Sequence, residues 1–310
     1  MEYIILDVDT GIDDALAIAY AVRSPLAEVL GLTTCFGNTS VEEATRNSLQ
    51  VLELLGADHI PVAMGAPNPL LRAPLKQKAT AIHGENAIGD VELPLPKSEA
   101  LAIDAATFIV NTVRERPGQV TLVTVGSQTN LALAIMKDPE IVKLVKRVVI
   151  MGGAVTVPGN VTPVAEANIY SDPEAAAYVF QSGIPITLVG LDVTMQTLLT
   201  REHLADWRAK GTDLGRTLAD MCDFYMDAYY QFNPTLGGCA LHDPLAVGVV
   251  LDPTFVQTRS LHVQVDTEGS LSIGRTIGDL RANSAQAPNM DVCLEVDVER
   301  FVTHFLEWVV

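Results

Sequence analysis

The sequence is poor in basic residues: its 310 residues include 20 Lys and Arg against 38 Asp and Glu, a formal net charge of −18. Such a charge repels phosphate, which argues against unspecific binding to nucleic acid or to an anionic membrane surface. No apolar run approaches the roughly 18 residues of a membrane span, and the N-terminus lacks the pattern of a signal peptide. We therefore expect no nucleic-acid partner and no membrane, and a charge compatible with a site for a cation.

Cysteines are few and far apart. The four of them, Cys35, Cys222, Cys239 and Cys293, form no CxxC pair and no evident disulfide framework. Thiols spaced in this way fit a reducing compartment, so we predict a cytoplasmic protein with four buried structural thiols.

No Gly/Ser linker, composition break or internal repeat divides the chain. With 48% hydrophobic and 19% charged residues, it is globular and long enough to bury a large core. Its length permits two domains, but large α/β sheets often run this long as one. We predict a single domain over residues 1–310.

Apolar, strand-like runs alternate with helical patterns through the first two thirds of the chain. The predicted strands lie at residues 3–6, 29–33, 120–125, 148–151 and 185–189, and the predicted helices at residues 15–22, 41–55, 101–113, 131–136 and 173–181. This alternation predicts an α/β fold with an open, mostly parallel Rossmann-like sheet and helices on both faces. The rest is predicted as long functional loops over residues 64–98 and 152–170, helix over 200–232, a small β excursion over 254–295 and a closing helix over 298–310.

Four aspartates, Asp7, Asp9, Asp13 and Asp14, lie within eight residues, directly after the first predicted strand. Asp7 and Asp9 are two residues apart, so they point to the same side of an extended segment. Asp13 and Asp14 open the next helix, where carboxylates favour the positive end of the helix dipole. The cluster thus lies at the carboxyl end of a strand, where open α/β sheets place ligands.

Four carboxylates this close together stay ionised only if a positive charge lies between them; otherwise some of their pKa values rise. A hard divalent cation with oxygen ligands is the economical solution. In the alternative, Asp13 and Asp14 only cap the helix while Asp7 and Asp9 are solvated. That alternative accounts for two of the carboxylates well and for all four poorly, so the pattern favours a metal site.

A metal site alone does not define the reaction. An Asp-x-Asp pair after a first strand also opens the haloacid-dehalogenase-type phosphatases, whose first aspartate is a nucleophile. In those enzymes Gly and then Thr follow the pair, whereas residues 7–11 read DVDTG, and no acidic pair follows a later apolar strand convincingly. A metal-dependent phosphatase is therefore the second hypothesis.

The string DVDTGIDDA at residues 7–15 resembles the N-terminal signature of the inosine–uridine-type nucleoside hydrolases. Further segments similar to that family follow in order along almost the whole chain: Gly37 with Asn38, His83 with Gly84, Val125 with Gly126, Thr129 with Asn130, Met151 with Gly152 and Gly153, Asn160, Glu166 with Asn168, Asp172 with Pro173, and His242 with Asp243 and Pro244. The resemblance implies an N-glycosyl hydrolase of nucleoside salvage. Such an enzyme splits a ribonucleoside into ribose and free base through an oxocarbenium-like transition state.

The resemblance also implies a calcium ion, held by Asp9, Asp14, the backbone carbonyl of Val125 and Asp243. In that mechanism Asp9 accepts the proton of the attacking water that the ion holds. The flexible, all-oxygen coordination of calcium suits chelation of two ribose hydroxyls. Asp7 is expected to orient the cluster.

The resemblance further places a set of side chains around the nucleoside: Asp13, Asn38, His83, Met151, Asn160, Glu166 and Asn168. Tyr225 and Tyr229 are one helical turn apart, and this spacing predicts that they border the base pocket. Amides and carboxylates directed at the ribose hydroxyls would reject deoxy sugars, because unpaired polar groups are costly. The alternative for Asn160 and Asn168 is a role in loop-forming turns. Met151, Tyr225 and Tyr229 have the alternative of packing in the core.

His242 precedes Asp243 directly, where base-unspecific members of the family carry a histidine. A purine anion leaves poorly, so an acid with a pKa of about 7 assists its departure, and we expect His242 in that role. The sequence departs from the family pattern at residues 10, 83–87 and 126–130. Ala167 also stands where an aromatic residue is common. These departures leave the base preference open.

Two further hypotheses remain: a non-catalytic nucleoside or sugar binder, which would bind uridine and leave it intact, and a relative that acts on another ribosyl compound. By the same resemblance we expect a small-molecule ribonucleoside as substrate and a homodimer or homotetramer.

Overall fold

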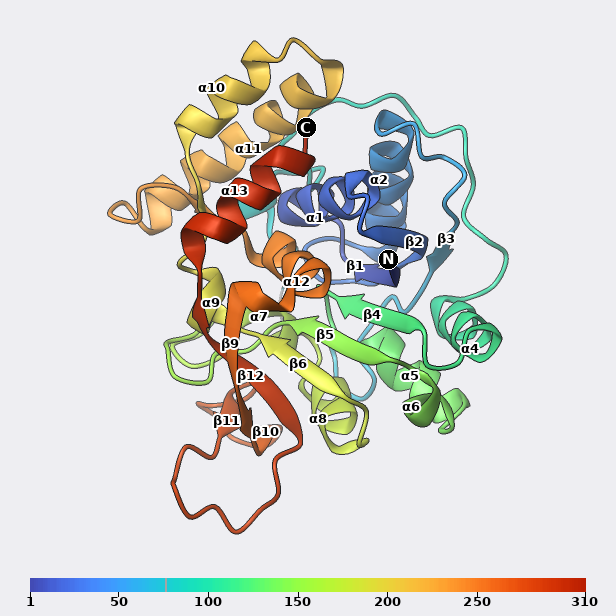
Figure 1. The fold of residues 1–310 in the computed structure, drawn as a ribbon, viewed down its shortest axis with the longest axis vertical. Coiled ribbons are helices and arrows are strands. Elements are labelled where there is room, and N and C mark those ends of the chain that lie inside the picture. The colour runs from blue at the N-terminus through green and yellow to red at the C-terminus, as the bar shows by residue number, and fades with distance from the viewer. Residues whose placement is uncertain (76) are drawn as a thin grey trace.

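The computed structural model describes residues 1–75 and 77–310, and an eight-stranded sheet runs through this part of the chain (Figure 1). Across the sheet the order is β3 (Val62–Met64), β2 (Ala27–Thr34), β1 (Glu2–Val8), β4 (Val120–Thr124), β5 (Arg147–Met151), β6 (Ile186–Val189), β12 (Met290–Val296) and β9 (Val256–Leu261). Neighbouring strands are parallel except β12 and β9, which pair antiparallel at one edge. The strand order reverses between β1 and β4, and ligands bind at such switch points in open α/β sheets.

Successive residues of the inner strands face opposite sides of the sheet, and both sides are apolar. In β1, Ile4, Leu6 and Val8 belong to one buried cluster, whereas Ile5 belongs to another. A parallel strand covered on both faces needs apolar residues throughout, which explains the continuous apolar runs of the sequence. The predicted fold class is confirmed.

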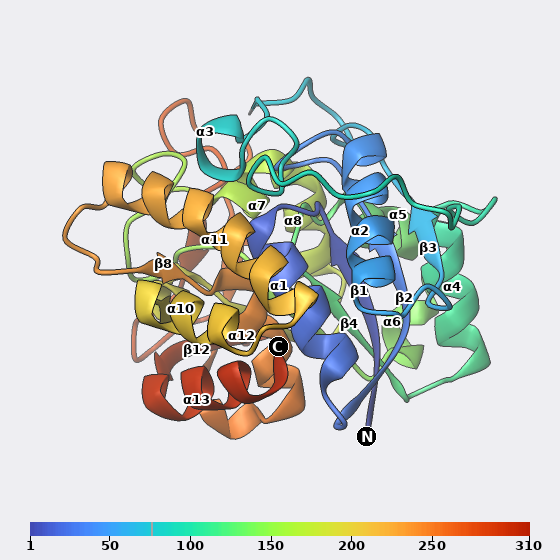
Figure 2. The same ribbon diagram turned by 90° about the horizontal axis from the view of Figure 1, so that it is seen from above.

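Helices cover both faces of the sheet (Figures 1 and 2). One buried cluster includes residues of α1 (Ile12–Arg23), α2 (Val41–Leu54), α10 (Arg201–Ala209), α11 (Asp213–Phe232), α12 (His242–Leu251) and α13 (Val298–Trp308). The other includes residues of α4 (Ala105–Glu115), α5 (Thr129–Lys137), α6 (Ile141–Leu144) and α8 (Pro173–Gln181). Helix α12 is buried over nearly its whole length and packs against α1, which brings the first turns of these two helices together.

Two predicted helices differ from the structure. The helix predicted over residues 101–113 begins at Ala105, because Asp104 caps it: the Asp104 carboxylate accepts a hydrogen bond from the backbone N–H of Thr107 at 2.8 Å. Residues 200–232 form two helices, α10 and α11. Gly211 between them has a φ of 72°, a left-handed conformation that ends a helix.

The C-terminal strands differ more. The sequence predicts a small β excursion over residues 254–295, but β9 and β12 extend the main sheet beyond β6. Strands β10 (Val263–Val265) and β11 (Thr276–Gly278) pair with each other in a separate hairpin. Tertiary contacts decide which strand pairs with which, and the local pattern does not contain them.

The predicted loops contain short helices. Helix α3 (Thr80–His83) lies within residues 64–98, and α7 (Ala167–Ser171) begins within residues 152–170. Helix α9 (Leu191–Thr194) follows β6, and the short strands β7 (Leu198–Leu199) and β8 (Cys239–Ala240) pair beyond it. Each short helix places side chains at the site described below.

Neither a disulfide nor a membrane-spanning helix is found in the described residues. All four cysteines are buried and unpaired, as the sequence predicts. No helix there is both long and apolar enough to cross a bilayer.

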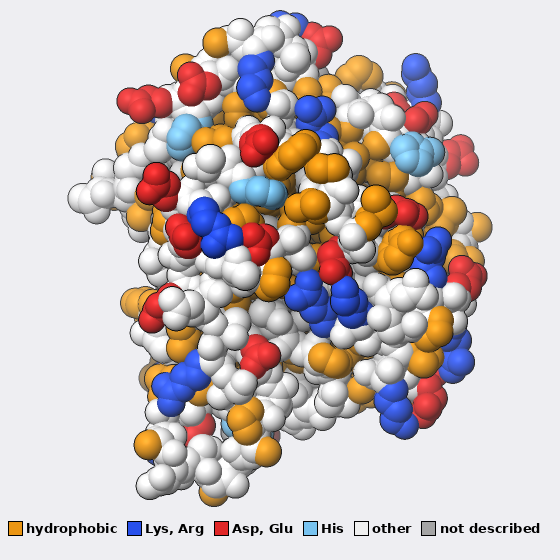
Figure 3. Space-filling view, viewed as in Figure 1, with side chains coloured by type: hydrophobic (Ala, Val, Ile, Leu, Met, Phe, Trp, Pro, Cys, Tyr) orange, Lys and Arg blue, Asp and Glu red, His pale blue; other side chains and the backbone are white. Residues whose placement is uncertain are grey.

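The surface mixes charges of both signs with apolar groups, as one face shows (Figure 3). Lys146 pairs with Glu2 at 2.7 Å and Arg300 with Asp252 at 2.6 Å. Partly exposed pairs of this kind contribute about 0–1 kcal/mol each. The stability of the fold therefore comes mainly from the two apolar clusters.

Candidate active site

A cavity of about 960 Å³ lies at the carboxyl ends of β4, β5 and β6, within the size range of small-molecule sites. Twelve of the predicted site residues line it: Asp13, Asn38, His83, Val125, Met151, Asn160, Glu166, Asn168, Tyr225, Tyr229, His242 and Asp243. The other two, Asp9 and Asp14, are buried behind this lining and contact Asn38. The structure thus gathers all the predicted residues at one place.

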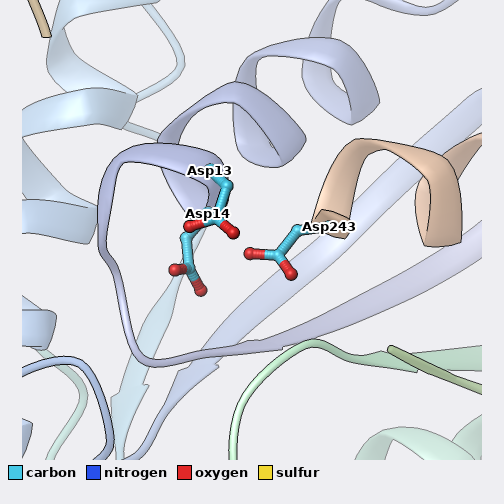
Figure 4. Close-up of side chains that lie close together, drawn as sticks. All are labelled: Asp13, Asp14 and Asp243. Atoms are coloured by element: carbon cyan, nitrogen blue, oxygen red, sulfur yellow. The ribbon is translucent and has the colours of Figure 1, made fainter. Parts of the chain in front are cut away.

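Three carboxylates converge beside the switch point of the sheet (Figure 4). Asp13 and Asp14 project from the first turn of α1 and Asp243 from that of α12, and one oxygen of each lies within 4.8 Å of the others. All three are buried, and the described residues that line the cavity include no Lys or Arg. Anionic oxygen donors without a neighbouring cationic side chain fit a hard divalent ion, so this cluster could hold a metal.

The convergence disfavours full ionisation of these groups. Burial, and after it the charge of Asp9, raises the pKa of Asp13 to about 7. Burial and neighbouring aspartates raise the pKa of Asp14 and that of Asp243 well above the usual range of a carboxyl group. In addition, Asp13 Oδ1 is buried without a hydrogen-bond partner. A buried acceptor of this kind is costly, and a cation would relieve both the repulsion and the missing partner.

Asp9 is held by hydrogen bonds from the loop that follows β2. Its carboxylate accepts hydrogen bonds from the backbone N–H of Asn38 at 2.6 Å and from the Asn38 side-chain amide at 3.2 Å. Its own N–H donates to Asp14 at 3.1 Å. A Cβ at Gly37 would collide with the carboxylate, so the close approach requires glycine. Of the three carboxylate ligands that the sequence predicts, Asp14 and Asp243 belong to the group close enough to share an ion, together with Asp13. The role of Asp9 stays a prediction.

Asp7 is buried and lies outside the lining of the cavity. Its Oδ1 accepts hydrogen bonds from the Thr33 hydroxyl at 2.5 Å and from the Asn130 amide at 2.7 Å. Burial outweighs these hydrogen bonds and raises the pKa of Asp7 to about 7. The side chain links β1 to strand β2 through Thr33 and to helix α5 through Asn130.

The predicted sugar-binding residues also organise the loop backbone. Glu166 caps α7, and its carboxylate accepts hydrogen bonds from three backbone N–H groups, those of Gly153, Asn168 and Ile169, at 2.9 to 3.2 Å. The Asn168 amide donates to the carbonyl of Val125 at 2.7 Å, the predicted backbone ligand. The Asn160 side-chain oxygen accepts from the N–H of Ala167 at 3.0 Å.

Aromatic residues and imidazoles form another part of the wall. His242 Nε2 lies 2.7 Å from the Tyr229 hydroxyl, and His242 Nδ1 lies 2.8 Å from the Thr194 hydroxyl. Tyr225 donates a hydrogen bond to Asp13 at 3.3 Å and stacks on His83, with ring centroids 5.4 Å apart. Burial lowers the pKa of His242 to about 4. The His242 imidazole is therefore neutral at neutral pH, whereas the sequence predicts that this residue is an acid with a pKa of about 7.

Sequence reasoning misses one segment of the wall. Leu191, Asp192, Met195 and Gln196 line the cavity, and Thr194 contacts His242. These residues directly follow β6. Their position after the predicted strand at residues 185–189 was the available signal, since the carboxyl ends of parallel strands meet at the ligand site.

Comparison with known proteins agrees with this geometry. Residues 4–303 match the family described as inosine-uridine preferring nucleoside hydrolase. The chain therefore belongs to the inosine-uridine preferring nucleoside hydrolase family. It is an N-glycosyl hydrolase that splits ribonucleosides into ribose and base. The two alternative hypotheses, a metal-dependent phosphatase and a non-catalytic nucleoside binder, are therefore wrong.

Relatives are similar over most of their length. The chain is 43% identical to uridine nucleosidase 1 of Arabidopsis thaliana over 279 residues, which cover 90% of this chain and 82% of the relative. It is 38% identical to the pyrimidine-specific ribonucleoside hydrolase RihA of Citrobacter koseri, over 96% and 95% of the two chains. The solved structure of a purine-preferring ribonucleoside hydrolase from Gardnerella vaginalis superposes with a TM-score of 0.95 at 44% identity, over 99% and 98%. The names of these relatives differ in the base, so similarity alone leaves the base preference open.

Proposed function

We propose that this hydrolase accepts both purine and pyrimidine ribonucleosides. The observation that carries the proposal is the wall of rings formed by His83, Tyr225, Tyr229 and His242 within a cavity of about 960 Å³, in which burial holds His242 neutral. The carboxylate of Asp192, which also lines the cavity, is hydrogen-bonded to loop backbone. The other polar side chains include Gln77, Gln196 and Asn233, whose amides can both donate and accept hydrogen bonds and therefore suit more than one base.

The test is release of base from inosine and uridine, measured side by side with the purified protein. We expect both bases to be released, with kcat/KM values within about 200-fold of each other. The Asp9→Asn variant, purified in the same way, controls for contaminating nucleosidase. Release of only one base by the wild type would contradict the broad specificity and keep the class of enzyme.

We infer that the acidic cluster binds calcium. The proposed ligands remain Asp9, Asp14, Asp243 and the carbonyl of Val125, and Asp13 is close enough to take part. When bound, such an ion would lower the pKa of a coordinated water and orient the ribose diol. The raised pKa values and the unpartnered Asp13 oxygen support a cation at this place.

Asp9 is the proposed general base. The two hydrogen bonds from Asn38 hold its carboxylate in one orientation, which is what a base must have to accept a proton from a positioned water. The surrounding aspartates, when ionised, stabilise the positive charge that develops on the ribosyl ring. Asn160, Glu166 and Asn168 are the proposed partners of the sugar hydroxyls.

His242 and Tyr229 are the proposed partners of the leaving base. Because burial holds His242 neutral, we propose that its Nε2 donates a hydrogen bond to the Tyr229 hydroxyl 2.7 Å away and that this hydroxyl donates to the base. A donor at this place stabilises the negative charge on the departing base.

The variant His242→Ala tests this role. We expect kcat for inosine to fall about 100-fold or more, and kcat for nitrophenyl riboside, whose leaving group needs no assistance, to fall much less. The matched variant Tyr229→Phe keeps the ring and removes only the hydroxyl, so it should show the same preference to a smaller extent. Equal losses on the two substrates would refute the role in leaving-group departure.

Three further properties are proposals. The four buried, unpaired thiols support a cytosolic location. The main sheet contains both β1, near the N-terminus, and β12, near the C-terminus. One sheet built from both ends of the chain supports a single domain over residues 1–310. A homodimer or homotetramer is proposed from the family resemblance.

A further inference from the structure

A run of five residues, 152–156, carries the chain from the end of β5 into the wall of the cavity, and every backbone N–H of this run has an acceptor. Backbone groups with defined partners fix the path of a segment. The acceptors, in order, are the carbonyl of Val189 at 3.2 Å, Glu166 Oε2 at 2.9 Å, the Thr276 hydroxyl at 2.8 Å, Asp192 Oδ2 at 2.9 Å and Asp192 Oδ1 at 2.7 Å.

Asp192 contributes most to this arrangement. Besides the N–H groups of Val155 and Thr156, its carboxylate accepts a hydrogen bond from the Thr156 hydroxyl at 2.5 Å. The side chain is only 5% exposed. Its position is itself fixed, because the N–H of Leu191 donates to the carbonyl of Gly153 at 2.8 Å. Asp192 therefore joins the turn after β6 to the loop after β5.

Residues 157–161 continue from this run and line the cavity. Asn160 is among them, and its side-chain oxygen accepts from the N–H of Ala167, which also lines the cavity. The distance between this wall and the carboxylates of Asp13 and Asp243 across the cavity depends on where the chain leaves β5. The carboxylate of Asp192 holds Val155 and Thr156, the two residues that directly precede this wall.

We propose that Asp192 is a positioning residue that holds residues 157–161 where a bound nucleoside requires them, and so governs substrate capture without taking part in bond cleavage. The proposal rests on the proposed function, in which Asn160 binds the sugar. Asp192 acts at a distance, through the backbone of Val155 and Thr156. Its effect is therefore expected on KM, since an interaction equal in the ground state and the transition state changes KM and leaves kcat.

The test uses the full-length variant Asp192→Asn. Asparagine keeps the size of the side chain but turns an N–H₂ group toward a backbone N–H, so one hydrogen bond of the run is lost. We expect KM for uridine and for inosine to rise about 5- to 100-fold, as for a buried donor left without its partner, with kcat within about twofold. An unchanged KM, or a fall in kcat at constant KM, would overturn the proposal.

Asp172→Asn is the matched control. Asp172 is equally buried and also holds a loop: it accepts from the N–H of Leu70 at 2.8 Å and from the Thr129 hydroxyl at 2.7 Å. It does not line the cavity. Both variants should lower the melting temperature, but only Asp192→Asn should raise KM. The same change of KM in both would assign Asp192 a merely structural role.

A double variant tests the route through Asn160. On the background of Asn160→Ala, we expect Asp192→Asn to raise KM by less than about threefold, because coupled residues are not additive. Fully additive effects would show that Asp192 does not act through Asn160. Calorimetric binding of ribose to the same variants separates this inference from the proposed function. Suppose that the wild type released no base but bound ribose. A Kd for ribose that rises in Asp192→Asn and not in Asp172→Asn would still support the positioning role, and an unchanged Kd in Asp192→Asn would overturn it.

Discussion

Replacing Asp9 with asparagine is expected to lower kcat for inosine and uridine by about 10²–10⁴-fold, the usual contribution of a general base, while ribose still binds. An amide cannot accept the proton of the attacking water. Its oxygen can still accept the hydrogen bond from the Asn38 backbone, so the close approach to Gly37 can persist. Steady-state release of base measures the first effect, and calorimetric titration with ribose measures the second.

The control for this variant is Asp7→Asn. Asp7 lies two residues before Asp9, within β1, but it is hydrogen-bonded to Thr33 and Asn130 and does not line the cavity. Its replacement should cost activity less than that of Asp9. If Asp9→Asn retained kcat within tenfold, or lost ribose binding together with turnover, Asp9 would not be the base.

Calcium is expected to stabilise the protein strongly at pH 8 and weakly at pH 5.5. The raised folded-state pKa values of Asp13, Asp14 and Asp243 mean that the folded protein binds protons more tightly than the unfolded chain. The stability that these protons contribute is fully present below the unfolded pKa of about 4. It is lost as pH rises through the folded pKa, about 7 for Asp13. Calcium must displace the same protons, so its affinity rises with pH.

Thermal unfolding of chelator-treated protein, with and without added calcium, measures this effect. At one hundred times its Kd a ligand adds about 2.7 kcal/mol, which corresponds to a rise in Tm of several degrees. Base release should disappear with the chelator and return with calcium. Asp243→Asn should remove most of the gain in Tm, whereas Asp172→Asn, outside the cluster, should keep it. An equal gain at both pH values would contradict the proposed carboxylate site.

The parts of the site that sequence analysis predicts are those determined by neighbours along the chain. The cluster from Asp7 to Asp14 follows an apolar strand directly, and the topology of α/β sheets then places it at the ligand site. Partners that meet only in the folded chain could not be predicted in this way. Asp192 accepts hydrogen bonds from the N–H groups of Val155 and Thr156, although it lies in helix α9, and Thr194 contacts His242, which is 48 residues away in the sequence.

The same distinction applies to the fold. Hydrophobic periodicity predicts the inner strands and their crossover helices, because each pattern lies within one element. Strand β12 can pair with β6 only because the earlier elements leave that edge of β6 free. No local sequence pattern contains this information. The break between α10 and α11 had a local signal in Gly211, a residue that commonly ends helices.

The packing of α12 against α1 has a consequence for biosynthesis. Asp13 and Asp14 precede Asp243 by more than two hundred residues, so at about 5–20 residues per second the ribosome completes the acidic cluster roughly 10–50 s after beginning it. Until α12 has emerged and docked, the nascent chain has only part of the cluster. The acidic cluster is therefore complete only after most of the chain has been made, so its three carboxylates come together late in folding.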